Sequence, residues 1–301
     1  MTFLNTHLSV IRWHVLVCAL VFGFNPLSSL AANTNYACNA PVVSIGQVSY
    51  DPFAAISTLT GTATLNCSKA KNDPASMAFS LSVDLGLGSS GGYSYAAMSS
   101  NTVRYDLLRS ASASDAWSAT PISGTMTNWT CSSNTCSGTA TVNFYMQIPV
   151  SQPSPYTATG FYTDTRIVTP SYPNAGGVLT SYPASGGNLS IAIGIPAKCV
   201  LSSPPGNINF TYTSFQGSAD QRSTSFAVSC ATNTQYTMAL DATSGTILGL
   251  NYTLSLNKTG TQTGTFTAQS VSITGNMPGR QSGNCSSNCT DQHNRTLTIS
   301  Y

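Results

Sequence analysis

The chain has 301 residues, enough for two ordinary domains, and its formal net charge is only +2. Charged residues make up 7% of it, so no strong field favours a highly charged partner, and we expect no nucleic-acid partner. Ser, Thr, Gly and Asn take the places that charges usually occupy, while Val, Ile, Thr and Tyr recur. This composition is typical of an all-β protein.

Residues 1–32 predict a signal peptide. Arg12 precedes an apolar run from Val15 to Phe24, and the small residues that follow suit cleavage after Ala31 or Ala32. The run is too short to span a membrane. Lipid attachment at Cys18 is disfavoured, because Val17 stands where a small residue is usual. We therefore expect export, and predict a fold for the residues that follow.

Eight cysteines remain after the signal peptide. An even number in an exported chain indicates disulfides formed in an oxidising compartment. Their spacing predicts two long pairs and two short local pairs, namely Cys38–Cys67, Cys199–Cys230, Cys131–Cys136 and Cys285–Cys289. A zinc site is disfavoured, since the short spacings are not Cys-x-x-Cys and one histidine, His293, follows the signal peptide. We expect no metal and no cofactor.

The two halves of the chain repeat one pattern. Residues 147–172 align without a gap on residues 276–301 at an offset of 129, which matches Pro149 with Pro278, Gln152 with Gln281, Arg166 with Arg295 and Tyr172 with Tyr301. In each half a cysteine closes one strand, and two strands of alternating polarity follow. The sequence therefore predicts one β-sandwich unit used twice.

The boundary between the units is predicted in a segment rich in Gly, Pro and Ser. We expect an N-terminal domain over residues 33–175, a linker or closing strand over 176–187, and a C-terminal domain over 188–301. The stretch NLSIAIGIP is predicted to open the second unit, with Leu189, Ile191 and Ile193 alternating toward one face. The first unit carries an insertion at about 110–138 that holds Trp117 and Trp129.

These motifs, in this order, resemble the spore coat U domain family. The carriers of the resemblance are the cysteine that closes a strand, Leu-Asn-Tyr-Thr-Leu, Gly-x-x-Pro-x-x-Gln and a final Thr-Leu-Thr-Ile-Ser-Tyr. It is strongest over residues 188–301 and weaker over 38–172. Such domains form subunits of archaic, Csu-type chaperone–usher pili, and two in tandem resemble a tip adhesin.

The resemblance implies two immunoglobulin-like Greek-key sandwiches in tandem, the C-terminal one lacking its last strand. A periplasmic pilus chaperone, and then an adjacent pilus subunit, would donate that strand by β-strand addition, with an outer-membrane usher assembling the fibre. The groove is expected between two rows of side chains: Leu297, Ile299 and Tyr301 on one side, and Leu189, Ile191 and Ile193 on the other. For the first unit, residues 176–183 are a candidate closing strand. With five or six residues before Cys38, we expect no strand to donate, and hence a place at the pilus tip.

Three loops of the first unit are predicted to attach it to hydrophobic or abiotic surfaces, as in biofilm formation. On the expected topology they lie at the end far from the second unit, near 49–56, 85–99 and 149–161. Grouped apolar side chains on exposed loops mark a contact surface. The candidates are Tyr50, Phe53, Leu85, Leu87, Tyr93, Tyr95, Met98, Val150, Pro155 and Tyr156.

Two other functions stay open, and an enzyme is disfavoured. A sugar-binding tip lectin would use aromatic stacking, for which Trp117 and Trp129 are candidates. A secreted coat or matrix protein would share the fold without the open groove. For an enzyme, a lone His293 and dispersed aspartates such as Asp84, Asp164 and Asp241 are more typical of surface and turn residues than of catalytic groups.

Overall fold

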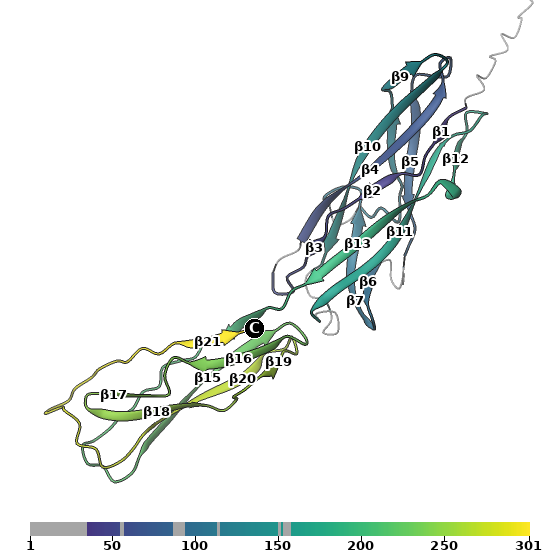
Figure 1. Cartoon of the computed structure of the whole chain (residues 1–301). Coiled ribbons are helices and arrows are strands. Elements are labelled where there is room, and N and C mark those ends of the chain that lie inside the picture. The colour runs from purple at the N-terminus through teal and green to yellow at the C-terminus, as the bar shows by residue number, and fades with distance from the viewer. Residues whose placement is uncertain (1–34, 55–56, 87–93, 113–114, 150–151, 153–157) are drawn as a thin grey trace, which may run out of the picture. The chain divides into compact units, whose positions relative to one another are not determined.

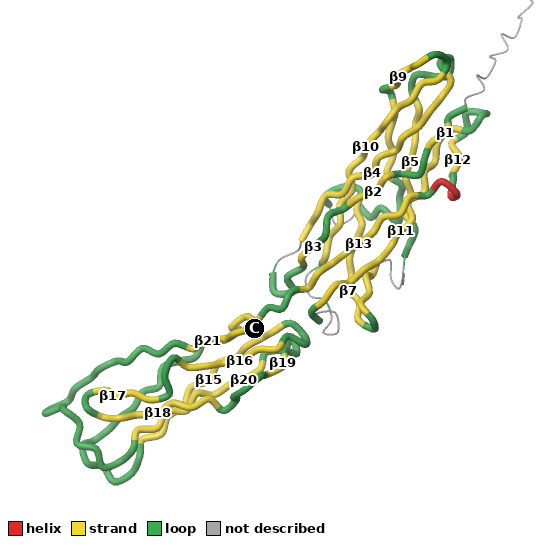
Figure 2. Tube along the Cα trace, viewed as in Figure 1, coloured by secondary structure: helices red, strands yellow, loops and turns green. Residues whose placement is uncertain are grey.

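The structure, a computed structural model, describes residues 35–54, 57–86, 94–112, 115–149, 152 and 158–301. Nearly all its regular structure is β-strand, as the composition predicts (Figure 2). The strands fall into two groups that share no sheet, and each group surrounds its own hydrophobic core (Figure 1). We call them the first sandwich (residues 35–195) and the second sandwich (residues 199–301). No helix in the described ranges has the length and apolar character needed to cross a membrane.

The first sandwich contains thirteen strands in one continuous hydrogen-bonded path with side branches. They are β1 (Ala37–Cys38), β2 (Val42–Ser44), β3 (Val48–Ser49), β4 (Ser57–Ala70), β5 (Met77–Val83), β6 (Ser94–Met98), β7 (Asn101–Leu108), β8 (Ile122–Met126), β9 (Trp129–Ser132), β10 (Thr135–Ile148), β11 (Gly160–Pro173), β12 (Leu179–Ser181) and β13 (Gly187–Ile195), with a short 3-10 helix, η2 (Pro183–Ser185), before β13. Strands β4 and β10 pair antiparallel along their whole length.

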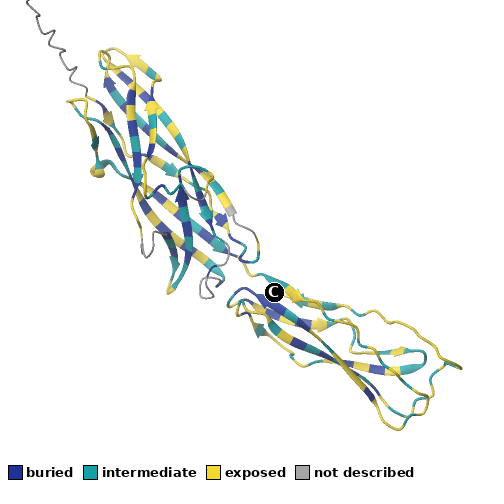
Figure 3. Cartoon of the chain, turned by 180° about the vertical axis from the view of Figure 1, so that it is seen from behind, coloured by how far each residue is buried: buried dark blue, intermediate teal, exposed yellow. Residues whose placement is uncertain are grey.

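Side chains of period two build the core of this sandwich. Along β11 buried and exposed residues alternate strictly from Phe161 to Val168, as expected for strands with one buried face (Figure 3). The ring of Phe144 on β10 lies directly over Gly61 on β4, where a Cβ would come within 2.2 Å of it. Glycine is needed there because the aromatic ring fills the space of a side chain.

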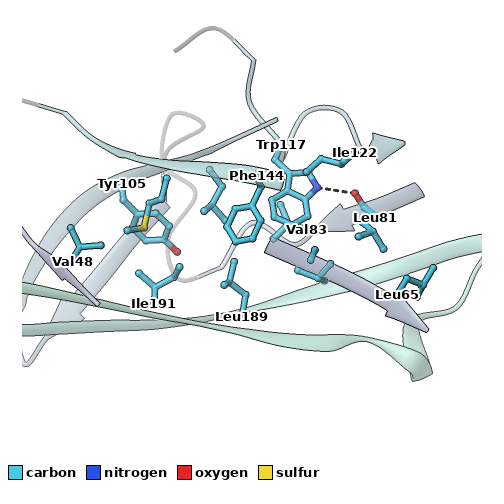
Figure 4. Close-up of a cluster of buried hydrophobic side chains, with 14 of the residues drawn as sticks. Val48, Leu65, Leu81, Val83, Tyr105, Trp117, Ile122, Phe144, Leu189 and Ile191 are labelled. Atoms are coloured by element: carbon cyan, nitrogen blue, oxygen red, sulfur yellow. Dashed lines mark hydrogen bonds between the residues drawn. The ribbon is translucent and has the colours of Figure 1, made fainter. Parts of the chain in front are cut away.

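Trp117 lies inside the core rather than on the surface. Its Nε1 donates a hydrogen bond of 2.7 Å to the Leu81 carbonyl, and its ring packs 4.9 Å from that of Phe144 (Figure 4). The insertion thus supplies a core residue and the short strands β8 and β9. Trp117 is unavailable to stack on a sugar, while Trp129 is half-buried beside Tyr36.

Strand β13 closes the first sandwich. It pairs antiparallel with β11 from Gly160↔Ile195 to Val168↔Gly187, and parallel with β3 on its other side. Leu189, Ile191, Ile193 and Ile195 are all buried in the first core. The prediction that this stretch opens the second unit is therefore wrong. The 176–183 segment instead forms β12, a hairpin partner for the end of β11.

The second sandwich has two sheets. They contain β14 (Cys199–Ser203), β15 (Asp220–Cys230), β16 (Gln235–Leu240), β17 (Ser244–Ile247), β18 (Leu250–Leu256), β19 (Gln262–Thr263), β20 (Gln269–Met277) and β21 (Leu297–Ser300). One sheet has the order β14-β15-β20-β18-β17, and the other has the order β19-β16-β21. Between them lies a core centred on Phe226, Val228, Tyr236 and Val271.

Four disulfide bonds join the cysteine pairs that the spacing predicts. Cys38–Cys67 and Cys199–Cys230 link residues directly opposite each other on paired strands, at matching places in the two sandwiches. Cys131–Cys136 crosses the β9–β10 hairpin, and Cys285–Cys289 closes a loop before β21. The shared position of the two long disulfides supports the predicted repeat.

Candidate functional site

The aligned motifs of the two halves make the same contacts. Gln152 donates from Nε2 to the Arg104 and Pro149 carbonyls, and Gln281 donates to the Asn251 and Pro278 carbonyls. Oε1 of Gln152 also accepts from the backbone N–H of Arg104, and Oε1 of Gln281 accepts from the backbone N–H of Asn251. The offset of 129 therefore marks a structural repeat and allows the two sandwiches to be compared position by position.

On this comparison, the place that β13 occupies is open in the second sandwich. Strand β21 corresponds to part of β11 and pairs with β16 on one edge, just as β11 pairs with β5. The first sandwich also has β13 on the other edge of β11, whereas in the second sandwich no described strand pairs with that edge of β21. Residues 289–296, which correspond to the part of β11 that pairs with β13, form no strand.

A groove of about 770 Å³ lies at this open place. Its apolar lining comes from both sheets and from the segment before β15, and includes Ile208, Phe210, Leu240, Ile247, Leu250, Leu254, Ile273, Met277 and Leu297. The segment around Phe210 and Tyr212 corresponds to β3, since Tyr212 contacts the Pro-x-x-Gln motif as Tyr50 does. The groove therefore runs between the equivalents of β11 and β3, where β13 lies in the first sandwich.

The predicted groove residues divide between the two sandwiches. Leu297 lines the groove, and Ile299 packs against the second core, while Tyr301 is 58% exposed. Leu189, Ile191 and Ile193 lie in the first core, so they do not form the opposite wall as predicted. Alternation in a sequence identifies a strand with one apolar face, but it does not identify which core that face enters.

A polar cluster in each sandwich was not recognised from the sequence. In the first, Arg166 contacts Asp84 at 2.9 Å and donates to the Tyr105 hydroxyl at 3.3 Å, and Tyr105 donates to Asp164 at 2.5 Å. Arg166, Tyr105 and Asp164 are buried. Burial, reinforced by the hydrogen bond to Asp164, raises the pKa of Tyr105, so its hydroxyl keeps its proton.

The second cluster joins residues at equivalent positions but faces the groove. Arg295 Nε donates to the Tyr252 hydroxyl at 2.9 Å, and that hydroxyl lies 2.8 Å from Nδ1 of His293. Asp241, which follows β16 as Asp84 follows β5, lies 3.9 Å from Arg295. All but Asp241 line the groove. The offset of 129 matches Asp164 with His293, and this was the signal in the sequence that could have revealed the pair.

The predicted surface loops are only partly exposed. Tyr50 is 1% exposed and its hydroxyl donates to the Pro149 carbonyl, so its place in the predicted contact surface is wrong. Leu85 is 51% exposed, whereas Phe53, Tyr95 and Met98 are half-buried. The remaining candidates lie outside the described residues: Leu87, Tyr93, Val150, Pro155 and Tyr156.

Two of these loops also lie at the opposite end from the one predicted. Residues 50–54 follow β3, which pairs with β13 at Ile193 and Gly194, and residues 158–159 precede β11, whose first residue pairs with Ile195. Both loops are thus at the end where the chain leaves the first sandwich. The prediction of the far end was wrong because it assumed that the chain leaves the first sandwich at the end of β11. The chain instead returns along β13, antiparallel to β11, and leaves at the opposite end.

The sequence comparison identifies the family of the first sandwich. Residues 27–169 match the family model of the Spore Coat Protein U domain. The match supports the resemblance carried by the motifs, although it covers the first half of the chain rather than the second. No curated protein matches the sequence significantly.

Three solved structures are distantly similar. A chain from the CsuC–CsuE chaperone–tip adhesion subunit complex of Acinetobacter baumannii Csu pili shares 14% identity, with 88% of this chain and 100% of that chain covered and a TM-score of 0.46. The CupB6 tip adhesin of Pseudomonas aeruginosa shares 12%, with 89% and 94% covered and a TM-score of 0.31. A chaperone–tip adhesin complex of CFA/I fimbriae shares 10%, with 85% and 94% covered and a TM-score of 0.27.

Proposed function

We propose that the chain is an exported tip adhesin of a chaperone–usher pilus, whose second sandwich accepts a strand from another polypeptide. The observation that carries this proposal is the groove itself. It lies in the second sandwich at the place equivalent to that of β13 in the first, and its wall residue Leu297 follows residues 289–296, which form no strand. An unpaired edge beside an apolar groove favours aggregation unless a strand covers it.

The geometry of β13 specifies the strand that would fit. The incoming strand runs antiparallel to residues 289–297 and places apolar side chains at alternate positions, as Leu189, Ile191 and Ile193 are placed in the first sandwich. In this proposal a periplasmic chaperone supplies such a strand before assembly, and an adjacent pilus subunit supplies it in the fibre, with an usher mediating the exchange. The first sandwich is closed by its own strand, which fits a unit at the end of a fibre.

A grafted tail tests this proposal directly. Because Tyr301 matches Tyr172, a second copy of residues 173–195 attached after Tyr301 would reproduce the hairpin and closing strand of the first sandwich. We expect the extended chain to be monomeric, with a higher unfolding temperature for the second sandwich. The unextended chain should associate, or require a chaperone or an added peptide with the β13 sequence.

The matched control is the same tail with Ser in place of the residues that correspond to Leu189, Ile191 and Ile193. This tail keeps its length and backbone hydrogen-bonding groups but loses its apolar face, so it should not stabilise the second sandwich. If the unextended chain is a stable monomer with slow hydrogen exchange along residues 289–300, the groove needs no strand and the proposal fails.

For attachment, we propose that the first sandwich contacts apolar surfaces through the 85–99 loop. Leu85, a predicted contact residue of this loop, is 51% exposed and therefore accessible to a surface. Replacing it with Asp should reduce binding of the protein to polystyrene several-fold. Val42, which is 63% exposed on β2, provides the control, because Val42→Asp should leave binding unchanged. Equal loss in both variants would contradict a local contact surface.

A further inference from the structure

The two polar clusters place different acceptors at one equivalent position. An arginine donates to a tyrosine hydroxyl in both, from Arg166 to Tyr105 and from Arg295 to Tyr252. An arginine side chain can only donate, so the tyrosine proton is free to pass to a third group. In the first sandwich this third group is the Asp164 carboxylate, which can only accept when ionised.

In the second sandwich the third group is His293, and its ability to accept depends on its protonation. The Tyr252 hydroxyl can donate to Nδ1 only when that nitrogen carries no proton. Protonated His293 could no longer accept from Tyr252, so their contact would persist only with His293 as the donor, and a second positive charge would lie beside Arg295. A carboxylate at the same position, as in the first sandwich, accepts the hydrogen bond and adds no positive charge.

Filling the groove would bury this cluster. In the first sandwich Leu189 lies opposite Arg166, and Ile191 lies opposite Asp164, so β13 covers both. At the matching positions of the second sandwich Arg295 and His293 line the open groove, and His293 is exposed. A charged imidazole is costly to bury without a compensating partner.

The charged and titratable groups around His293 come from its own segment, from two other elements of the lining and from the residue after β16. Arg295 and Asp291 lie on its own segment, Tyr252 on β18 and Tyr212 on the segment before β15, and all line the groove. The carboxylate of Asp241, after β16, is 3.9 Å from Arg295 and is already shared with that charge. Asp291 is exposed, and its matching residue in the first sandwich is the buried Tyr162.

We propose that His293 makes strand addition to the second sandwich dependent on pH, so that the closed groove requires a neutral imidazole and acid favours release of the strand. The inference rests on the proposed function, because it needs a strand in the groove. The open form can bind a proton at His293 and the closed form excludes it, so closure weakens as the pH falls. The equilibrium constant for closure should therefore fall several-fold between pH 7.5 and 5.5.

The extended chain that carries the copy of residues 173–195 tests the inference. Its second-sandwich unfolding constant is measured by chemical denaturation at pH 7.5 and 5.5, and compared with that of His293→Asn. Asn keeps an acceptor oxygen close to the place of Nδ1 but does not titrate. We expect the folding equilibrium constant to fall several-fold on acidification with His293, and to change less than twofold with Asn. His293→Asp, which copies the first sandwich, should also show a small change.

Each outcome separates the inference from the proposed function. If the tail stabilises the second sandwich equally at both pH values, the groove accepts a strand but the inference is wrong. If acidification weakens the His293 and Asn proteins by the same factor, another group is responsible and the inference is again wrong. If the tail stabilises the second sandwich at neither pH, the proposed function fails and the inference fails with it.

Discussion

Gln152 binds both backbone groups of Arg104, since its Oε1 accepts from the amide at 3.2 Å and its Nε2 donates to the carbonyl at 2.9 Å. Gln281 repeats this arrangement on Asn251 at 2.7 and 3.0 Å. Each glutamine is thus attached to the strand that carries the cluster tyrosine.

Gln152→Ala should destabilise the first sandwich more than Gln281→Ala destabilises the second. Gln152 is buried, so its loss removes two hydrogen bonds to backbone groups of Arg104 in a partly buried site, at a cost of about 1–3 kcal/mol. Gln281 is half-exposed, and water can replace its contacts. Chemical denaturation of each variant measures the loss in free energy of unfolding. Equal losses in the two variants would contradict the greater burial of Gln152.

Ile191→Ala should destabilise the first sandwich by about 2–5 kcal/mol, because it removes a buried side chain from the closing strand. Ser190 lies on the same strand with its side chain exposed. Ser190→Ala is therefore the control and should change the free energy of unfolding by about 0.5 kcal/mol or less. If Ile191→Ala instead lowered the stability of the second sandwich alone, β13 would belong to the other core.

Tyr105→Phe should lower the stability of the first sandwich by about 1–3 kcal/mol. The lost hydroxyl both donates to Asp164 and accepts from Arg166 in a buried site, so two charged groups would lose a partner. Tyr145→Phe, at a half-exposed position on β10, is the matched control. A cost no larger than that of the control would show that Asp164 and Arg166 satisfy each other without the tyrosine.

Removing the Cys38–Cys67 disulfide should cost more than removing Cys131–Cys136. The first closes 29 residues and the second closes 5, and the loss of chain entropy on cross-linking grows with loop length. We expect about 2–4 kcal/mol for the double Cys→Ala variant of the long pair. Thermal unfolding of the two variants under the same conditions provides the comparison, and the reverse order would contradict this ranking.

The sequence predicted the strands, the disulfides and the repeat, because alternation, cysteine spacing and self-alignment are local properties of the chain. The sequence did not predict which core β13 enters. An alternating strand fits any core that lacks one strand, and β13 lies in the sequence between the strands of the first sandwich and those of the second. Tyr50 was expected on the surface because its neighbours Asp51 and Pro52 are typical of a loop. Its burial depends on the distant Pro149 carbonyl, which no local pattern reveals.

The position of β13 also has a mechanical consequence. The chain leaves the first sandwich immediately after this strand, so tension transmitted from the second sandwich acts on its last residue, Ile195. A pull along the axis of the strand would load its hydrogen bonds to β11 together rather than break them one after another. The first sandwich should therefore resist tension from the second until the whole strand slides out at once.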